Sequence, residues 1–289
     1  MILPRSQTLW LAALLAMGVI GWDTALGPES GYWRAQPTWV DPRPLPPGAR
    51  PAGGLRVLFI GNSFTGYWGG QVLIGTKIAT SSPGWTERPP MYEQVTGSGM
   101  DLEGHWRFGR AVGRIREGNW DCVVLQDHSE GPLNRRSAFF RYARLLDLEI
   151  RKVGAKTVLF MTWSKKQEPE LQSALAEAYR SLGREIGAAV VPVGLAFERA
   201  GAGRPGLELH DVDGKHPSRA GSYLTACCFY RYFYGRSPVG LSRTIQDGAR
   251  EWIAMDEAEA RYLQEIADRT GVTNSMEAGE SNEFEWFKK

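Results

Sequence analysis

The chain has 289 residues, of which 43% are hydrophobic and 11% aromatic, and its formal net charge is +2. This composition supports a buried core and excludes an intrinsically disordered protein. The small net charge, without a run of Lys or Arg, gives no indication of a nucleic-acid partner. Three cysteines cannot build a disulfide framework, and none has zinc-ligand spacing with a histidine, so we expect buried thiols and no metal.

The N-terminal segment predicts export. Arg5 precedes an apolar run from Leu9 to Trp22, which suits a secretory signal and is short for a membrane span. We interpret residues 1–26 as a signal peptide or as an uncleaved signal anchor that tethers the protein to a membrane. Both interpretations place the protein outside the cytoplasm, as periplasmic, secreted or membrane-anchored. A third interpretation is a hydrophobic helix packed on the domain.

Residues 27–53 are rich in proline and predict a linker, whereas residues 273–289 form a polar tail. Between them, residues 54–272 alternate between strand and helix patterns. We expect strands at Leu55–Ile60, Met91–Val95, Cys122–Leu125, Thr157–Thr162 and Ala188–Val193. We expect helices at Asp101–Glu117, Arg135–Lys152, Pro169–Ile186, Pro217–Tyr234 and Asp256–Thr270. This alternation predicts an α/β domain with a parallel sheet covered by helices on both faces.

A serine stands directly after the first predicted strand, in the sequence Gly61-Asn62-Ser63-Phe64-Thr65. Functional loops of parallel sheets lie at the carboxyl ends of the strands, so this position suits a nucleophile. Asn62 and Ser63 are also residues that favour turns and helix caps. On position alone, Ser63 is therefore either a nucleophile or a simple cap.

A second polar block, Asp213-Gly214-Lys215-His216-Pro217, precedes the predicted helix Pro217–Tyr234. The spacing lets the Asp213 carboxylate reach one ring nitrogen of His216 and leaves the other free to take a proton from Ser63. The alternative is that Asp213 orders a turn and His216 caps the helix. We set aside the neighbouring His210 and Asp211, because adjacent residues point apart.

Two features predict a site that stabilises an oxyanion. Gly99 follows the Met91–Val95 strand, and we expect its N–H at the start of the next helix. Gln126 ends the third strand and could add a side-chain donor. The alternatives are an ordinary tight turn at the glycines and a structural glutamine.

These blocks resemble those of the SGNH (GDSL-like) hydrolases. V-L-F-I-G-N-S-F-T is similar to their first block, with Asn62 where many members have Asp, and D-G-K-H-P-S-R-A-G-S-Y-L is similar to their last. The resemblance implies a flavodoxin-like three-layer α/β/α sandwich with strand order 2-1-3-4-5. It implies Ser63 as nucleophile, His216 as base, Asp213 as the partner of His216, and oxyanion donors at the N–H groups of Ser63 and Gly99.

One block departs from the family pattern. The third block normally supplies an asparagine after the third strand, where this chain has Leu125-Gln126-Asp127-His128-Ser129. We choose Gln126 as the side-chain donor, with His128 and Ser129 as alternatives. Asn62, His128 and Trp163 are further candidates for substrate contact.

The leading hypothesis is an exported serine esterase that acts through an acyl-enzyme on a short-chain acyl ester, such as an acetylated carbohydrate, and needs no cofactor. The first alternative is an O-acyltransferase that uses the same residues. The others are a carbohydrate-binding protein without turnover and a structural envelope protein.

Overall fold

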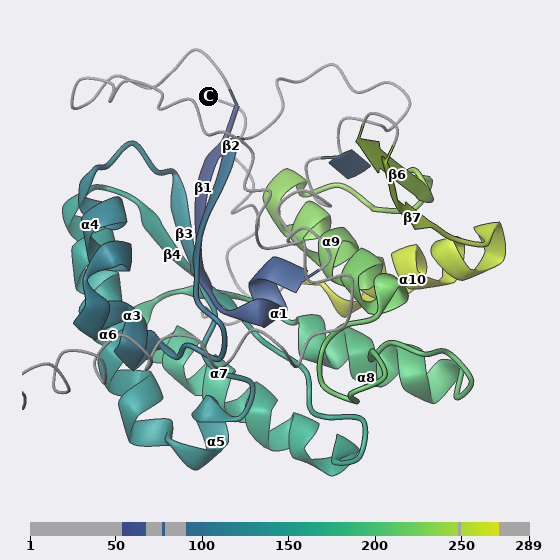
Figure 1. Cartoon of the computed structure of the whole chain (residues 1–289), viewed down its shortest axis with the longest axis horizontal. Helices are drawn as coiled ribbons and strands as arrows, with labels where there is room; N and C mark the ends of the chain where they lie inside the picture. The colour runs from purple at the N-terminus through teal and green to yellow at the C-terminus, as the bar shows by residue number, and fades with distance from the viewer. Residues whose placement is uncertain (1–53, 68–76, 79–90, 248–249, 272–289) are drawn as a thin grey trace, which may run out of the picture. The chain divides into compact units, whose positions relative to one another are not determined.

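The computed structural model in Figure 1 describes residues 54–67, 77–78, 91–247 and 250–271. All of them belong to one compact unit, Pro44–Lys289. The predicted signal segment, linker and C-terminal tail lie outside the described residues. Within those ranges, no helix has the length and apolar character needed to cross a membrane.

The core of the fold is a five-stranded sheet. Its strands are β1 (Arg56–Gly61), β2 (Met91–Thr96), β3 (Cys122–Leu125), β4 (Lys156–Phe160) and β5 (Ala189–Val191). All neighbouring strands are parallel, in the order β2-β1-β3-β4-β5, which confirms the predicted order 2-1-3-4-5. β1 and β3 are buried along their length and, apart from Arg56, apolar, because both faces of the sheet are covered.

Successive strand residues point to opposite faces of the sheet. On one face, Leu58 and Ile60 belong to a core cluster with residues of α3 (Leu102–Phe108), α4 (Arg110–Arg116), α6 (Arg136–Lys152) and α7 (Gln172–Ile186). On the other, Val57 and Phe59 pack with residues of α8 (Val193–Gly203), α9 (Arg219–Tyr234) and α10 (Glu257–Thr270). Figure 1 shows α4 and α9 on opposite sides of the sheet. The predicted three-layer sandwich is confirmed.

Several element boundaries differ from the expectation. The helix expected at Asp101–Glu117 is two helices, because Gly109 adopts φ 75° and ends α3. The fifth strand stops at Val191, since Pro192 is the N-cap of α8. The helix expected from Pro217 begins at Arg219 with Ser218 as its N-cap, so His216 lies two residues before the cap and does not cap the helix itself.

Other elements were not expected. They are α1 (Ser63–Gly66), α5 (Gly131–Asn134), the helix α8, and an antiparallel pair of β6 (Thr244–Asp247) and β7 (Arg250–Ala254). The helix expected at Pro169–Ile186 begins with a 3-10 turn, η3 (Pro169–Leu171), before α7. The expectation of three free, buried cysteines is confirmed.

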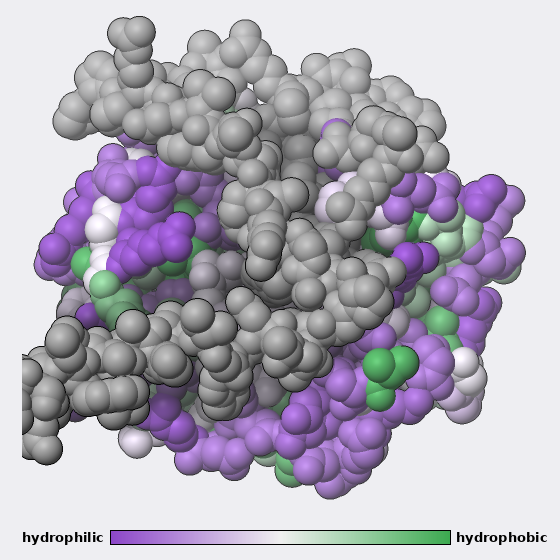
Figure 2. All heavy atoms as spheres, in the orientation of Figure 1, coloured by the Kyte–Doolittle hydropathy of each residue, from purple (hydrophilic) through white to green (hydrophobic). Residues whose placement is uncertain are grey.

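Figure 2 shows one face of the molecule, on which the described surface is mainly hydrophilic, with apolar side chains in small separate areas. Large apolar side chains exposed in the described residues come from separate elements and loops: Met91, Phe108, Leu148, Val212 and Val239.

Candidate active site

Ser63 lies in a tight turn between β1 and the short helix α1. Asn62 is the N-cap of this helix, and its side-chain oxygen accepts a hydrogen bond from Phe64 N at 3.0 Å. A Cβ at Gly61 would collide with the side-chain oxygens of Gln126 and Thr65, so only glycine permits this close approach. The turn leaves Ser63 at the first position of α1, at the carboxyl end of β1.

Three side chains form a continuous chain of hydrogen bonds. His216 Nε2 lies 2.8 Å from Ser63 Oγ, and His216 Nδ1 lies 2.5 Å from Asp213 Oδ2. A carboxylate only accepts, so Nδ1 carries a proton; in the neutral ring, Nε2 is then the acceptor for the Ser63 hydroxyl. The structure therefore brings together the three residues that the two sequence blocks single out.

The Asp213 carboxylate is held in its ionised form. Burial alone would raise its pKa, but hydrogen bonds from the His216 ring and from the backbone N–H groups of Lys215 and His216 outweigh it and lower the pKa. Both backbone groups donate to Asp213 Oδ1 at 2.9 Å, which leaves Oδ2 for the ring. The carboxylate therefore fixes the tautomer of His216 and favours a positive charge on its ring.

The loop that carries His216 is anchored to the loop that follows β4. The indole N–H of Trp163 donates to Lys215 O at 2.9 Å, and His210 Nε2 donates to Ser164 O at the same distance. His210, set aside on sequence grounds, is thus a structural anchor of the loop.

Trp163 was expected to contact substrate, and this prediction is wrong. The side chain is only 1% exposed and is stacked between two other rings. Its ring centroid lies 4.7 Å from that of Phe64 and 4.2 Å from that of Phe197, with interplanar angles of 2° and 3°. Both faces of the indole are covered, so neither can stack on a sugar.

The turn that contains Gly99 is tied to the nucleophile turn at two points. Gly97 N donates to Gly61 O at 3.2 Å, and the Asn62 side-chain amide donates to Met100 O at 3.0 Å. Gly99 itself adopts φ 63°, a conformation that favours glycine. It belongs to this turn and not to the start of α3, which begins at Leu102 with Asp101 as N-cap.

Two backbone N–H groups, one in the nucleophile turn and one in the Gly99 turn, are not used as donors within the part of the chain that the structure describes. Among the described residues, neither Ser63 N–H nor Gly99 N–H has an acceptor. Ser63 N is one of the first N–H groups of α1, which have no partner inside a helix. They are the two backbone donors that the family resemblance implies.

Gln126 does not fit its predicted role as the third donor. It is fully buried, and its amide nitrogen donates to Asn62 Oδ1 and to Asp127 O. Its side-chain oxygen accepts from Asn62 N and Thr65 Oγ1, each at 2.9 Å. Because both amide hydrogens are used inside the protein, Gln126 has none to offer a substrate and instead holds the nucleophile turn in place.

Two other candidates for substrate contact differ in exposure. Asn62 is 2% exposed and serves the turn, so its predicted substrate contact is wrong. His128 is exposed in the loop after β3, and its ring has no hydrogen-bond partner among the described residues.

His105, on α3, is a buried support of the nucleophile turn. Its Nε2 donates to Gly61 O at 2.7 Å. Burial lowers the pKa of His105, which favours the neutral ring.

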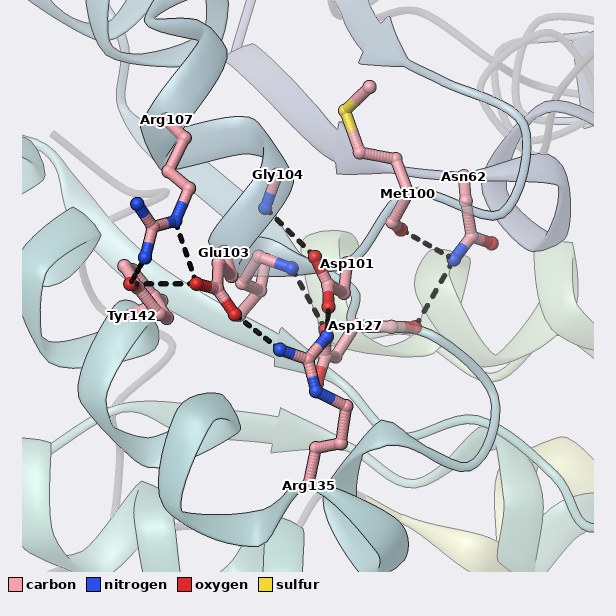
Figure 3. Close-up of polar contacts among 10 residues, drawn as sticks. Asn62, Met100, Asp101, Glu103, Gly104, Arg107, Asp127, Arg135 and Tyr142 are labelled. Carbon is pink, nitrogen blue, oxygen red and sulfur yellow. Dashed lines mark hydrogen bonds and ion pairs between the residues drawn. The ribbon is translucent and has the colours of Figure 1, made fainter.

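A polar network lies behind this edge of the site (Figure 3). Asp127 Oδ1 accepts from Leu102 N at 2.9 Å, which joins the end of β3 to the start of α3. Arg135 forms ion pairs with Asp101 and Glu103, also at the start of α3. Burial raises the pKa of Asp127 to about 6. The network holds α3 and the Gly99 turn against the nucleophile turn.

This arrangement can perform nucleophilic acyl chemistry. His216 can take the Ser63 proton while Asp213 balances the charge on the ring, and unpaired backbone N–H groups can receive a negative oxygen. Within the described ranges, no group of three or more His, Cys, Asp or Glu residues is arranged to hold a metal ion.

No protein-family model matches the chain, and no curated protein matches it. Solved structures do resemble it. A protein from Slackia heliotrinireducens, proposed to be an SGNH hydrolase, is 25% identical with a TM-score of 0.51, and the match covers 62% of this chain and 98% of that one.

Two further structures share the fold at lower identity. A DUF4886 family protein from Bacteroides uniformis is 16% identical, with a TM-score of 0.58 and coverage of 75% of this chain and 94% of that one. A variant of Axe2, an acetyl-xylooligosaccharide esterase from Geobacillus, is 16% identical, with a TM-score of 0.51 and coverage of 72% and 100%. The chain therefore has an SGNH-like hydrolase fold.

Proposed function

We propose that the protein is a serine esterase that hydrolyses short-chain acyl esters through an acyl-enzyme intermediate. The observation that carries the proposal is the hydrogen-bonded chain from Ser63 through His216 to Asp213. A serine hydroxyl is a poor nucleophile unless a base is within hydrogen-bond reach, and here the base is 2.8 Å away.

The reaction then has two halves. Ser63 Oγ attacks the ester carbonyl carbon as His216 takes its proton, and the carbonyl oxygen becomes an oxyanion bound by Ser63 N–H and Gly99 N–H. The intermediate collapses, His216 returns the proton to the leaving alkoxide, and the acyl group stays on Ser63. His216 then takes a proton from water as the water oxygen attacks the acyl-enzyme, and it returns this proton to Ser63 Oγ when the acid leaves.

For the substrate we propose an acetyl ester on a carbohydrate, outside the cytoplasm. Its support is the likeness of the fold to an acetyl-xylooligosaccharide esterase and the apolar run near the N-terminus. Exposed His128, in the loop after β3, is the remaining candidate of the predicted set for contact with the sugar.

The test is hydrolysis of p-nitrophenyl acetate by the full-length protein and by Ser63→Ala and His216→Ala. Both variants should lose at least about 10³-fold in kcat, since the residues of such a unit depend on one another. Ser237→Ala is a matched control, because Ser237 only accepts a backbone hydrogen bond from Val239. Equal turnover by wild type and Ser63→Ala would refute the proposal.

Two further measurements separate the alternatives. A fluorophosphonate should label wild type at Ser63, whereas a binding protein without turnover should stay unlabelled. Mass spectrometry of acetylated polysaccharides incubated with the protein should detect free acetate, whereas acetyl groups moved to added glycans would identify a transferase.

A further inference from the structure

Tyr67 lies directly against the ring of His216. It is the C-cap of α1, four residues after Ser63. Its ring is stacked on the imidazole, with the centroids 4.6 Å apart and an interplanar angle of 16°. Phe64 contacts the same imidazole edge-on, with centroids 5.5 Å apart. The segment that presents Ser63 thus also supplies two rings that contact its base.

The Tyr67 hydroxyl is hydrogen-bonded to the loop that carries His216. It donates to Asp211 Oδ2 at 2.8 Å, while Asp211 Oδ1 accepts from Val212 N at the same distance. Asp211 N in turn donates to His216 O at 2.7 Å. Tyr67 and Asp211 therefore connect the nucleophile helix to the backbone of His216 itself, by a route separate from Asp213.

The hydroxyl remains a donor at any ordinary pH. Burial, followed by the hydrogen bond to Asp211 and the charges of Asp211 and Asp213, raises the pKa of Tyr67 above its usual value. A phenol that donates to a carboxylate has a more electron-rich ring. Such a ring attracts a cation that lies over its face.

We propose that Tyr67, held by Asp211, is a positioning residue for His216 that also stabilises the imidazolium formed when His216 takes the Ser63 proton. The inference rests on the proposed esterase function. His216 is neutral in the ground state and positive in the transition state of both half-reactions. The stack therefore stabilises the transition state more than the resting site, which raises kcat and leaves KM nearly unchanged.

The experiment compares Tyr67→Phe with Tyr67→Leu in the full-length protein. We measure kcat and KM for p-nitrophenyl acetate, the rate of fluorophosphonate labelling, and the melting temperature. Leucine removes the aromatic face, so kcat and the labelling rate should fall about tenfold, with KM within about twofold of wild type. Phenylalanine keeps the ring and loses only the hydroxyl, so kcat should fall no more than about threefold.

Tyr262→Leu is the matched control. The Tyr262 hydroxyl donates to Ala200 O at 2.9 Å between α10 and α8, so its loss should lower the melting temperature and leave kcat unchanged. If Tyr67→Leu does not fold, Tyr67→Met takes its place with the same expected fall in kcat.

The results that would refute the inference differ from those that would refute the proposed function. Wild-type kcat in Tyr67→Leu, a change confined to KM, or an equal loss in the leucine and phenylalanine variants would show that the ring face does not act on His216. A wild-type protein that neither hydrolyses the ester nor reacts with the fluorophosphonate would instead refute the esterase, and the inference with it.

Discussion

Asn62 shows how much a single side-chain nitrogen contributes to this site. Its Oδ1 accepts from Phe64 N and Gln126 Nε2, and its Nδ2 donates to Met100 O at 3.0 Å and to Asp127 O at 3.5 Å. An aspartate, which many sequences of the resembling family have at this position, would turn an oxygen toward two carbonyl oxygens. The chain therefore requires a donor here, which an aspartate does not provide.

The expected result of Asn62→Asp follows from this contact. The variant should lose about 1–3 kcal/mol in free energy of unfolding, because a buried carboxylate would face the two carbonyl oxygens to which Asn62 donates. Its kcat should also fall, because the Gly99 turn loses its tie to the nucleophile turn. Urea unfolding and ester hydrolysis measure the two effects.

Asn134→Asp is the control for Asn62→Asp. The exposed Asn134 amide donates to Glu130 Oε2 at 3.2 Å, so the change should alter the unfolding free energy by only a few tenths of a kcal/mol and leave kcat unchanged. An Asn62→Asp variant as stable and active as wild type would mean that the Asn62 donor is dispensable.

At the scale of elements, the loop after β3 is joined to α3 by a buried carboxylate. Asp127 is 2% exposed, and its Oδ1 accepts from Leu102 N at 2.9 Å. Burial raises its pKa from 3.8 to about 6, although the N–H groups of Leu102 and His128 favour the ionised form. The folded protein thus holds this proton at a pH where the unfolded chain has released it.

This difference gives the stability a pH dependence of known sign. Between about pH 4 and pH 6 the folded state binds the extra proton, so the free energy of unfolding falls as pH rises through this range. The fall due to Asp127 is on the order of 2–3 kcal/mol. Asp127→Asn should remove that part, and urea unfolding at several pH values between 4 and 7 measures it. Parallel curves for the two proteins would contradict the expectation.

At the scale of the whole molecule, the two apolar layers differ in their relation to the site. The layer under α8, α9 and α10 contains Phe64, Trp163 and Phe197, whose stack ends at the nucleophile helix. The layer under α6 and α7 contains Phe139 and Tyr179, whose rings lie 5.0 Å apart. Of these two layers, as far as the structure describes them, the first alone includes a side chain that donates to the loop of His216, namely Trp163.

A paired substitution tests this asymmetry. Trp163→Leu and Phe139→Leu should each lower the free energy of unfolding by on the order of 2 kcal/mol, because each replaces a buried aromatic ring with a smaller side chain. Only Trp163→Leu should also lower kcat, measured where both variants are folded, because Lys215 O loses its donor. Equal kcat in both variants would show that the Trp163 contact does not support the site.

The sequence by itself predicts the five strands of the parallel sheet, the sandwich and the residues that meet at its edge. Buried strands such as Cys122–Leu125 are readable because both of their faces are apolar. Ser63, Asp213 and His216 are readable because their two blocks occur together, whereas each block alone also fits a turn or a helix cap. Their convergence depends only on topology, which the alternation of elements and the family resemblance predict.

The roles of Gln126, Trp163, Tyr67 and Asp211 required the tertiary structure. Gln126 and Asn62 are 64 residues apart, and Tyr67 and Asp211 are 144 apart. The local pattern of a sequence reports whether a residue is buried or exposed along its own element. It contains no information on which distant group uses an amide hydrogen or covers a ring, because that depends on how separate loops pack at the same edge of the sheet.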